Sequence, residues 1–230
     1  MKRTSKLILL PCLLLAGLTS LMAETASERL QESAVVLREI LSAPDQNIPR
    51  DLLNDAHCVV IVPGMKSAAF VVGARYGRGF IICRQNARFG WGAPAAVRIE
   101  CGSFGFQIGA SETDVVMLVM NRRGMDKLLQ SKFTLGGSAE VAAGPVGRSS
   151  TAQTDAEMTA KVLSYSRSRG VFAGIALQGA TLRQDLDENQ NLYGRRLTNR
   201  QIVMKSVAAP AAASELLAVL NLHSIHESGI

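Results

Sequence analysis

The chain has 230 residues, of which 47% are hydrophobic and 19% charged, so it can bury a full core and is not a disordered polyelectrolyte. Its formal net charge of +6 includes Lys2, Arg3 and Lys6. Without these three, 22 basic residues (25 minus 3) face 19 acidic ones and leave +3, which excludes the strongly basic character of a nucleic-acid-binding protein.

The first 23 residues predict a secretory signal peptide. The three cations precede the apolar run of residues 7–15, and small residues follow as far as Ala23. We expect cleavage after Ala23 and a secreted or periplasmic protein, peripheral to a membrane, that begins at Glu24. Residues 24–230 read as a single domain with a core of about residues 27–222. An uncleaved N-terminal anchor is the alternative, although the apolar run barely spans a bilayer.

Three cysteines follow the signal segment: Cys58, Cys83 and Cys101. All three lie in apolar, strand-like runs, so buried free thiols are the first expectation. An odd number cannot form a complete disulfide framework, but one disulfide among the three stays open. No close pair of cysteines indicates a metal site.

Residues 25–41 predict an amphipathic helix with Thr25 and Glu28 at capping-box spacing. One face is apolar and carries Leu30, Ala34, Leu37 and Leu41. The other face is mixed in charge and is expected in solvent: Glu28, Arg29, Glu32, Arg38 and Glu39. Since this face is not rich in lysine, we expect the helix to pack on its own domain.

A loop and a short helix after Pro49 lead into the predicted strands. The run "HCVVIVPG" predicts a buried strand that ends at Pro63 and Gly64, with His57 at its edge. Residues 68–76 and 80–84 then predict a hairpin around the turn 77–79. A further strand follows Pro94, and Trp91 before it is either a wedge into lipid or a lid on the core.

The stretch "GSFGFQIGASETDVVMLVMN" (102–121) predicts two strands, because residues 103–110 alternate with period two and residues 115–120 are continuously apolar. "SETD" (111–114) is then the turn of a hairpin. A membrane span is excluded, since six apolar residues are far short of the ~20 required. A phosphate loop is excluded because no Gly-x-Gly-x-x-Gly or Gly-Lys-Ser/Thr occurs here.

The remaining residues predict short helices and strands. Residues 125–132 read as a helix, residues 133–147 as a small-residue strand and turn, and residue 154 as a helix start. Strands follow around a turn at Arg169 and Gly170, and residues 185–195 are then a polar loop or short helix. Further helices are expected at 198–205 and after Pro210. The class is therefore α+β, with a curved, largely antiparallel β-sheet or partly closed barrel flanked by short α-helices.

The chain resembles the SYLF family. The similarity runs in order over about residues 27–222 and rests on "AHCVVIVPGMK", "GRGFIICR", "GSFGFQIGASETD", "VMNRRGMDKLL", "KFTLGGSAEVAAGPVGR", "YSRSRGVFAGIALQGATLRQD" and "LYG". The resemblance implies a lipid-binding module. Eukaryotic members stand beside Src-homology or FYVE modules, bind phosphoinositides and, in yeast, bind actin, whereas bacterial members are mostly stand-alone secreted or envelope proteins.

Basic residues of the first strands are the candidate binding groups: Lys66, Arg75, Arg78 and Arg84, with Arg167 and Arg169 as a second set. We expect them to attract anionic phospholipid or phosphoinositide-like headgroups at ~1 kcal/mol per basic residue, with limited apolar insertion. The arginines at 75, 78 and 84 would lie near one end of the predicted hairpin. Arg167 and Arg169 beside Tyr165 either clamp a phosphate or pair with Asp185 and Asp187.

Enzymatic chemistry is not expected, and neither is a cofactor. No Gly-x-Ser-x-Gly elbow occurs, and of His57, His223 and His226 only the first is in the sheet region. The residues Asp185, Asp187, Asn189 and Asn191 alternate as in a calcium loop, but Gln190 and Arg196 stand where the glycine and glutamate belong, so a surface turn is expected. The alternatives to membrane binding are a structural envelope module with a protein or polymer partner, and an acyl-chain carrier.

Overall fold

The computed structural model describes residues 24–43, 48–70, 72–85, 90–104, 109–136, 141–146, 161–168, 171–175, 177 and 179–224. The predicted signal peptide, the predicted helix start at residue 154 and Arg169 lie outside these residues. None of the described helices is both long and apolar enough to cross a membrane.

A nine-stranded curled sheet is the centre of the molecule, with the order β5-β9-β3-β2-β1-β4-β7-β6 and with β8 also on β7. Every neighbouring pair is antiparallel except β6 and β7, which confirms the predicted class. The strands are β1 (Cys58–Phe70), β2 (Val72–Cys83), β3 (Ala95–Phe104), β4 (Gly109–Val119), β5 (Lys132–Thr134), β6 (Val141–Ala143), β7 (Val162–Ser168), β8 (Val171–Gly174) and β9 (Thr181–Gln184).

Short helices flank this sheet, and their positions follow the local sequence signals. Thr25 and Thr198 form capping boxes at the starts of two of them, as predicted for Thr25. The helices are α1 (Ala26–Ser42), α2 (Arg50–Asp55), α3 (Arg122–Leu128), α5 (Leu186–Tyr193), α6 (Asn199–Met204) and α7 (Ser214–His223), the last preceded by a 3-10 turn (Ala211–Ala213).

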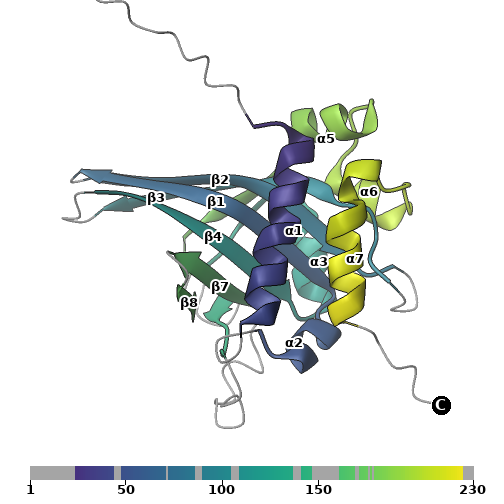
Figure 1. The fold of residues 1–230 in the computed structure, drawn as a ribbon. Coiled ribbons are helices and arrows are strands. Elements are labelled where there is room, and N and C mark those ends of the chain that lie inside the picture. Colours follow the sequence, from purple (N-terminus) through teal and green to yellow (C-terminus); the bar gives the residue numbers. More distant parts are fainter. Residues whose placement is uncertain are drawn as a thin grey trace, which may run out of the picture.

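Both faces of the central strands are buried against separate hydrophobic clusters. On one face, α1 and α7 lie side by side across the sheet, and Leu37 and Leu216 pack toward Ile61 and Phe80 (Figure 1). On the other face, α3 and α6 cover the sheet. The apolar runs 58–62 and 115–119 are therefore buried on both sides, as expected for Val115–Val119.

Arg29 departs from the expected solvent face of α1, because only 5% of its surface is exposed. Its guanidinium pairs with the buried carboxylate of Glu188 in α5 and with Glu24. The helix signal identified the correct apolar face, but a long-range ion pair draws one charged residue inside.

Pro63 and Gly64 do not end β1, contrary to the sequence expectation. The strand continues through a β-bulge, since one extra residue of β1 lies between Ile61, opposite Phe80, and Lys66, opposite Tyr76. Gly64 has a φ of +53°, and its N–H donates to Asp114 Oδ1 at 2.9 Å. The two residues therefore bend the strand instead of terminating it.

The expected hairpin turn at residues 77–79 is also wrong, because these residues lie in the middle of β2. A Cβ on Gly79 would lie 1.9 Å from the carbonyl oxygen of Ile61, and one on Gly77 would lie 2.6 Å from Val62 Cγ1. Both glycines permit a close backbone approach beside the bulge. The connection between β1 and β2 instead follows Phe70.

"SETD" (111–114) is likewise a strand segment and not a turn. Ser111 and Glu112 pair with Ser67 and Lys66 of β1, and Asp114 pairs with Arg167 of β7. The connection between β3 and β4 falls at residues 105–108, which lie outside the described residues.

Cys58 and Cys83 are opposite each other in β1 and β2, with Cα atoms 3.9 Å apart, and they form a disulfide. The first expectation of free thiols is thus wrong for this pair, and the single disulfide left open by the sequence is the one present. Cys101 is a free, partly exposed thiol on β3.

Candidate functional site

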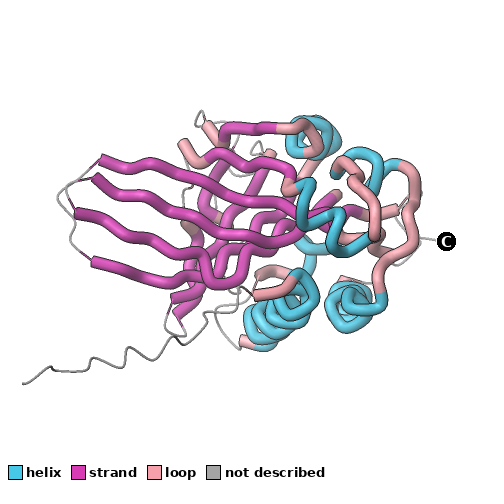
Figure 2. Tube along the Cα trace, turned by 90° about the horizontal axis from the view of Figure 1, so that it is seen from above, coloured by secondary structure: helices cyan, strands magenta, loops and turns pink. Residues whose placement is uncertain are grey.

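The four central strands extend well beyond the helices and form a projecting arm (Figures 1 and 2). We define the arm as residues 66–70 of β1, 72–76 of β2, 100–104 of β3 and 109–112 of β4. The flanking strands do not extend beyond its first row, since β9 pairs with β3 only as far as Glu100 and β7 pairs with β4 only from Asp114. None of the described helices therefore covers the arm.

Strand register aligns the arm in rows that each contain one residue of every strand. Counted outward from the body, the rows in the order β4, β1, β2, β3 are Glu112-Lys66-Tyr76-Glu100, Ser111-Ser67-Arg75-Cys101, Ala110-Ala68-Ala74-Gly102 and Gly109-Ala69-Gly73-Ser103. Backbone register then places Phe70, Val72 and Phe104 in the outermost row.

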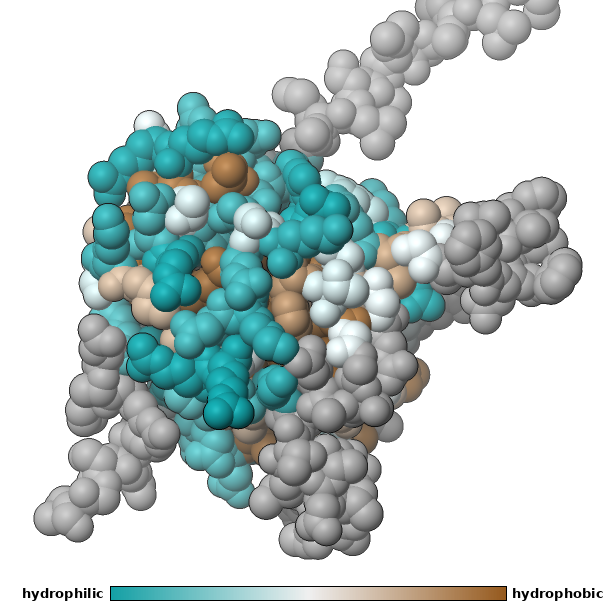
Figure 3. Space-filling model, turned by 180° about the vertical axis from the view of Figure 1, so that it is seen from behind, coloured by the Kyte–Doolittle hydropathy of each residue, from teal (hydrophilic) through white to brown (hydrophobic). Residues whose placement is uncertain are grey.

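The outer part of the arm is uncharged and made largely of small residues. Apart from Arg75, no residue from 67 to 76 or from 101 to 111 carries a charge. Ala68, Ala74, Gly102 and Ala110 form one exposed row across all four strands. From behind, the described part of the arm is a pale to brown projection from a largely teal body (Figure 3).

Lys66, Arg75 and Tyr76 border this uncharged end. Tyr76 shares a face with Phe80, on the α1 side, and Lys66 directly opposite it shares that face, whereas Arg75 points to the other side. The side chain of Tyr76 is 46% exposed. Within the described part of the chain, neither Lys66 nor Arg75 forms a salt bridge. The border therefore offers one cation on each face of the arm.

Two acidic residues, Glu100 and Glu112, lie in the same row as Lys66 and Tyr76, which we call the border row. They differ in their partners. Glu100 forms salt bridges with Arg98 and Arg183, with each Nε 3.1 Å from a carboxylate oxygen. Glu112 lies over Gly64 at the bulge, with its Oε1 2.6 Å from the position that a Cβ would take. The carboxylate of Glu100 is thus neutralised by arginines of the body.

Arg78 is not part of the arm's border, although the sequence suggested it as a binding residue. Its guanidinium lies 3.0 Å from Asp185 Oδ2 and 3.9 Å from Glu188 Oε2. These carboxylates are almost fully buried, and Arg29 pairs with Glu188 from the other side. Arg78 therefore compensates buried charge and connects β2 to α5.

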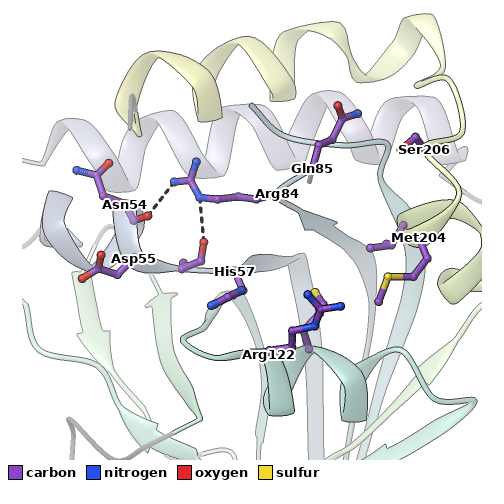
Figure 4. Close-up of a pocket in the computed structure, with 11 residues that line it drawn as sticks. Asn54, Asp55, His57, Arg84, Gln85, Arg122, Met204 and Ser206 are labelled. Carbon is purple, nitrogen blue, oxygen red and sulfur yellow. Dashed lines mark hydrogen bonds between the residues drawn. The ribbon is translucent and has the colours of Figure 1, made fainter. Parts of the chain in front are cut away.

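Arg84 lies at the opposite end of β2, and its guanidinium is occupied by backbone carbonyls. It donates to the oxygens of Leu53, Asn54 and Ala56, each at 3.1 Å, and Figure 4 shows it reaching the end of α2. It also stacks 4.4 Å above the ring of Trp91. The expected cluster of arginines at one end of a hairpin is therefore wrong, and Arg84 caps a helix C-terminus.

Arg167 pairs with Asp114, with its NH2 2.7 Å from Oδ2, and with Glu39 of α1. A salt bridge was one of its two expected roles, but the partners are not the predicted Asp185 and Asp187. Tyr165 is fully buried and cannot line a phosphate site at the surface. Of the five candidate residues that the structure describes, only Lys66 and Arg75 border the arm.

The root of the arm carries a group of carboxylates from α1 and β4. Burial raises the pKa of Asp114, and nearby Glu112 raises it further, against a hydrogen bond from the Gly64 N–H that lowers it. Partial desolvation raises the pKa of Glu32 to about 7, although its side chain stays accessible to solvent. A hydrogen bond that protonated Glu32 donates to Glu24 and the negative charges of Glu24, Asp114 and Glu112 act in the same direction. This root is therefore sensitive to pH near neutrality.

Comparison with known proteins identifies the family. The model of the Ysc84 family, described as Las17-binding protein actin regulator, matches residues 100–223. The chain belongs to the Ysc84 family. The SYLF resemblance inferred from the motifs is thereby confirmed.

Relatives of this Ysc84 family member occur in fungi and mammals. An SH3 domain-containing protein of Schizosaccharomyces pombe is 36% identical over 80% of this chain and 43% of its own length. SH3 domain-containing YSC84-like protein 1 of Homo sapiens is 31% identical over 83% of this chain and 57% of its own. Protein YSC84 of Saccharomyces cerevisiae is 30% identical over 89% and 45%, respectively. The chain thus spans about half the length of these relatives.

A polar cavity of about 310 Å³ lies between α2, α3 and α6 of this Ysc84 chain (Figure 4). His57, Arg122, Asp55 and Met204 are among the residues that line it. Over the described ranges, no three His, Cys, Asp or Glu side chains gather to hold a metal ion. The relatives are named as binding proteins or regulators, which agrees with a non-enzymatic role.

The calcium-like alternation of residues 185–191 is helical in the Ysc84 chain. Asp185 caps α5, with Oδ1 accepting from the Glu188 N–H at 3.2 Å. Asn189 is buried and accepts from the Ala96 N–H at 2.7 Å, so it holds α5 against β3. The pattern therefore serves helix capping and packing. The expected surface turn is wrong, whereas the short helix also expected over residues 185–195 is confirmed. Trp91 is a lid on the core, 5% exposed, with its indole donating to Ser224 at 2.7 Å.

Sequence reasoning missed the arm, although a signal for it was present. Residues 67–74 and 101–111 are two uncharged segments of small and aromatic residues, each centred on a strand connection. Recognising them as one surface requires the pairing of β2 with β3 and of β1 with β4, which no local pattern provides.

Proposed function

We propose that this Ysc84-family chain is a non-enzymatic module that binds anionic phospholipid surfaces through the end of its arm. The observation that carries the proposal is the four-stranded, uncharged outer part of the arm, which projects from the body and has Phe70, Val72 and Phe104 in its last backbone row. An uncharged sheet end that projects from its domain favours contact with a partner, since monomeric proteins rarely leave large apolar surface in water.

Apolar contact supplies more binding energy than charge in this arrangement. Each large apolar side chain contributes about 1.5–3 kcal/mol when fully transferred from water. A basic residue near an anionic surface contributes ~1 kcal/mol. Lys66 and Arg75 therefore add to an interaction that the apolar end dominates, which reverses the weighting that the sequence suggested.

The arm has the length to reach into one leaflet. The four steps from Lys66 to Phe70 span roughly 13 Å at ~3.3 Å per residue. Half of a bilayer's hydrocarbon core is about 15 Å thick. With the apolar row inserted, Lys66, Arg75 and Tyr76 stand at the level of the headgroups, where amphipathic and basic side chains are favoured.

We also propose export of the protein to an oxidising compartment, where residues 1–23 act as its signal. The Cys58–Cys83 disulfide supports this assignment, because such bonds persist outside the reducing cytosol. The membrane contacted would then be one that faces that compartment.

A protein partner is the second candidate function, and the family match favours it. The family is described by Las17 binding and actin regulation, and a relative in Saccharomyces cerevisiae is named LAS seventeen-binding protein 3. A protein-binding role predicts that substitutions in the arm leave vesicle binding unchanged.

Flotation of residues 24–230 with phosphatidylcholine vesicles, with or without phosphatidylglycerol, tests the membrane proposal. Phe70→Ser with Phe104→Ser is expected to weaken binding to both vesicles at least about tenfold, through lost apolar transfer. Lys66→Gln with Arg75→Gln is expected to weaken binding up to about 30-fold, and only to the anionic vesicles.

The matched control is Arg195→Gln with Lys205→Gln, which removes the same charge from exposed positions on the body. It is expected to float like the unmodified chain. Undiminished flotation of the phenylalanine variant, or an equal effect of the control, contradicts membrane binding through the arm.

A further inference from the structure

The two outer edges of the arm are open along their described residues. On β3, pairing with β9 ends at Glu100, so Cys101–Phe104 pair only with β2. On β4, pairing with β7 begins at Asp114, so the segment Gly109–Thr113 pairs only with β1. Each edge therefore presents backbone N–H and C=O groups without a ladder partner in the described structure.

The direction of these groups follows from hydrogen bonds at the base of each strand. In β3, the carbonyl oxygen of Ala96 accepts a hydrogen bond at 3.0 Å from the N–H of Asp185, the N-cap residue of α5. This oxygen therefore points away from β2. Met120, next to β4, donates to Lys161 O at 2.9 Å, away from β1. Successive residues of a strand direct their backbone N–H and C=O groups to opposite sides. The N–H and C=O groups of Gly102 and Ala110, which are an even number of residues from Ala96 and Met120, therefore also point outward.

Gly102 and Ala110 lie in the same row of the arm, at opposite edges. A second copy placed beside the first would bring its Ala110 opposite Gly102 at the same height. Because β3 runs toward the end of the arm and β4 runs back, the new pair is antiparallel, and the two residues can exchange both of their hydrogen bonds. The edges are thus complementary to each other.

We infer that membrane-bound copies pair side by side, with the β3 edge of one arm against the β4 edge of the next. This inference rests on the proposed membrane insertion of the arm. In hydrocarbon, each unpaired backbone group costs several kcal/mol, and open sheet edges do not persist there. A second copy supplies the missing partners at the matching height.

The side chains of the edges permit this pairing in the membrane and oppose it in water. Residues 101–104 include neither proline nor a charged residue, the usual protections of an edge strand. In the border row, Glu100 of one copy would lie opposite Glu112 of the next copy. These two carboxylates repel each other and therefore oppose pairing of the protein in water. Because the contact joins two different edges, it extends into a row or ring of copies.

The test uses the free thiol of Cys101 and the substitution Ser111→Cys. These residues share a row, so the inferred pairing places Cys101 of one copy directly opposite residue 111 of the next. Within one copy they are three strands apart, roughly 14 Å at ~4.8 Å per strand, which no disulfide bridges. Mild oxidation on vesicles containing phosphatidylglycerol is expected to give a ladder of covalent multimers in non-reducing gels.

Gly102 provides a matched pair of variants, because nothing lies within 4 Å of a Cβ built on it. In the Ser111→Cys background, Gly102→Pro removes the outward N–H and is expected to abolish the ladder, whereas Gly102→Ala retains it. The Ser111→Cys chain is expected to remain monomeric without vesicles.

Flotation of the same samples separates the two proposals. A Ser111→Cys chain that floats without forming a ladder overturns the pairing and leaves membrane binding intact, whereas a chain that does not float overturns membrane binding itself. A single covalent dimer of the unmodified chain through Cys101 contradicts the head-to-tail arrangement. A ladder of equal intensity from the Gly102→Pro variant contradicts the role of the β3 edge.

Discussion

The guanidinium of Arg78 lies 3.0 Å from a carboxylate oxygen of Asp185, and this contact connects the middle of β2 to the first residue before α5. Asp185 is 1% exposed and Glu188 beside it is 5% exposed. A buried carboxylate is tolerated when a cation compensates it. Arg78 is therefore a structural residue, only a few positions from Arg75, which borders the arm.

Substitution of these two arginines is expected to have opposite consequences. Arg78→Met leaves Asp185 and Glu188 with less compensation and should lower the free energy of unfolding by about 3–5 kcal/mol. Arg75→Met should change it by less than about 0.5 kcal/mol but weaken binding to anionic vesicles. Urea denaturation and flotation of both variants measure the difference, and equal stability losses would disprove the assignment.

Gly79 is expected to be intolerant of any side chain. A Cβ there would lie 1.9 Å from Ile61 O, so Gly79→Ala must displace β1 or β2 at the bulge and should cost about 3 kcal/mol or prevent folding. Gly102→Ala, on the neighbouring strand, is the control and should leave the thermal midpoint nearly unchanged. Thermal unfolding followed by circular dichroism tests the pair, and a stable Gly79→Ala protein would refute the close approach.

The disulfide is expected to stabilise the fold appreciably. Cys58 and Cys83 are separated by 25 residues, and the loop entropy lost from the unfolded chain corresponds to about 3 kcal/mol. Cys58→Ala with Cys83→Ala should lower the free energy of unfolding by roughly this amount. Denaturation with and without a reductant measures it, and Cys101→Ala, which should have no such effect, serves as the comparison.

The carboxylates at the arm's root make stability depend on pH. The folded-state pKa of Glu32 is raised from 4.5 to about 7, so the folded protein holds this proton more tightly than the unfolded chain. The associated stability is complete below pH 4.5 and is lost as the pH rises through about 7.

Glu32→Gln should therefore raise the thermal midpoint at pH 8 and have little effect at pH 4. The gain should be small, about 2 °C, because solvent screens this accessible side chain. Thermal unfolding across this pH range measures it. A gain that is the same at both pH values would show that the charge of Glu32 is not its cause.

Helices and strands were largely predictable from the sequence because their signals are local. The capping box of Thr25 and Glu28 and the apolar periodicity of α1 involve residues a few positions apart. The buried runs of β1 and β4 were equally clear from their continuous apolar composition.

The errors arose where a residue serves a distant partner. Gly77 and Gly79 resemble a turn in isolation, but their role is set by β1 across the sheet. Arg78 likewise has its partner, Asp185, more than 100 positions along the chain. The disulfide joins Cys58 to Cys83 and leaves Cys101 free because strand register places the first two opposite each other. Most of the candidate site was therefore beyond local reasoning. Among the described candidate residues, Lys66 and Arg75 lie at the border of the arm, and their role in lipid binding stays a prediction.

The bulge at Pro63 and Gly64 also marks the boundary between the body and the arm along β1. Its extra residue shifts the alternation of β1, so that Ile61 points toward α1 before the bulge and Lys66 does so after it. Deleting Gly64 would leave four steps between Ile61 and Lys66, as β2 has between Phe80 and Tyr76, so the strand pairing and the two faces of the arm would be kept while the bend was lost. A one-residue change at the base can thus redirect the arm relative to the body without exchanging its two surfaces or repacking the domain that carries it.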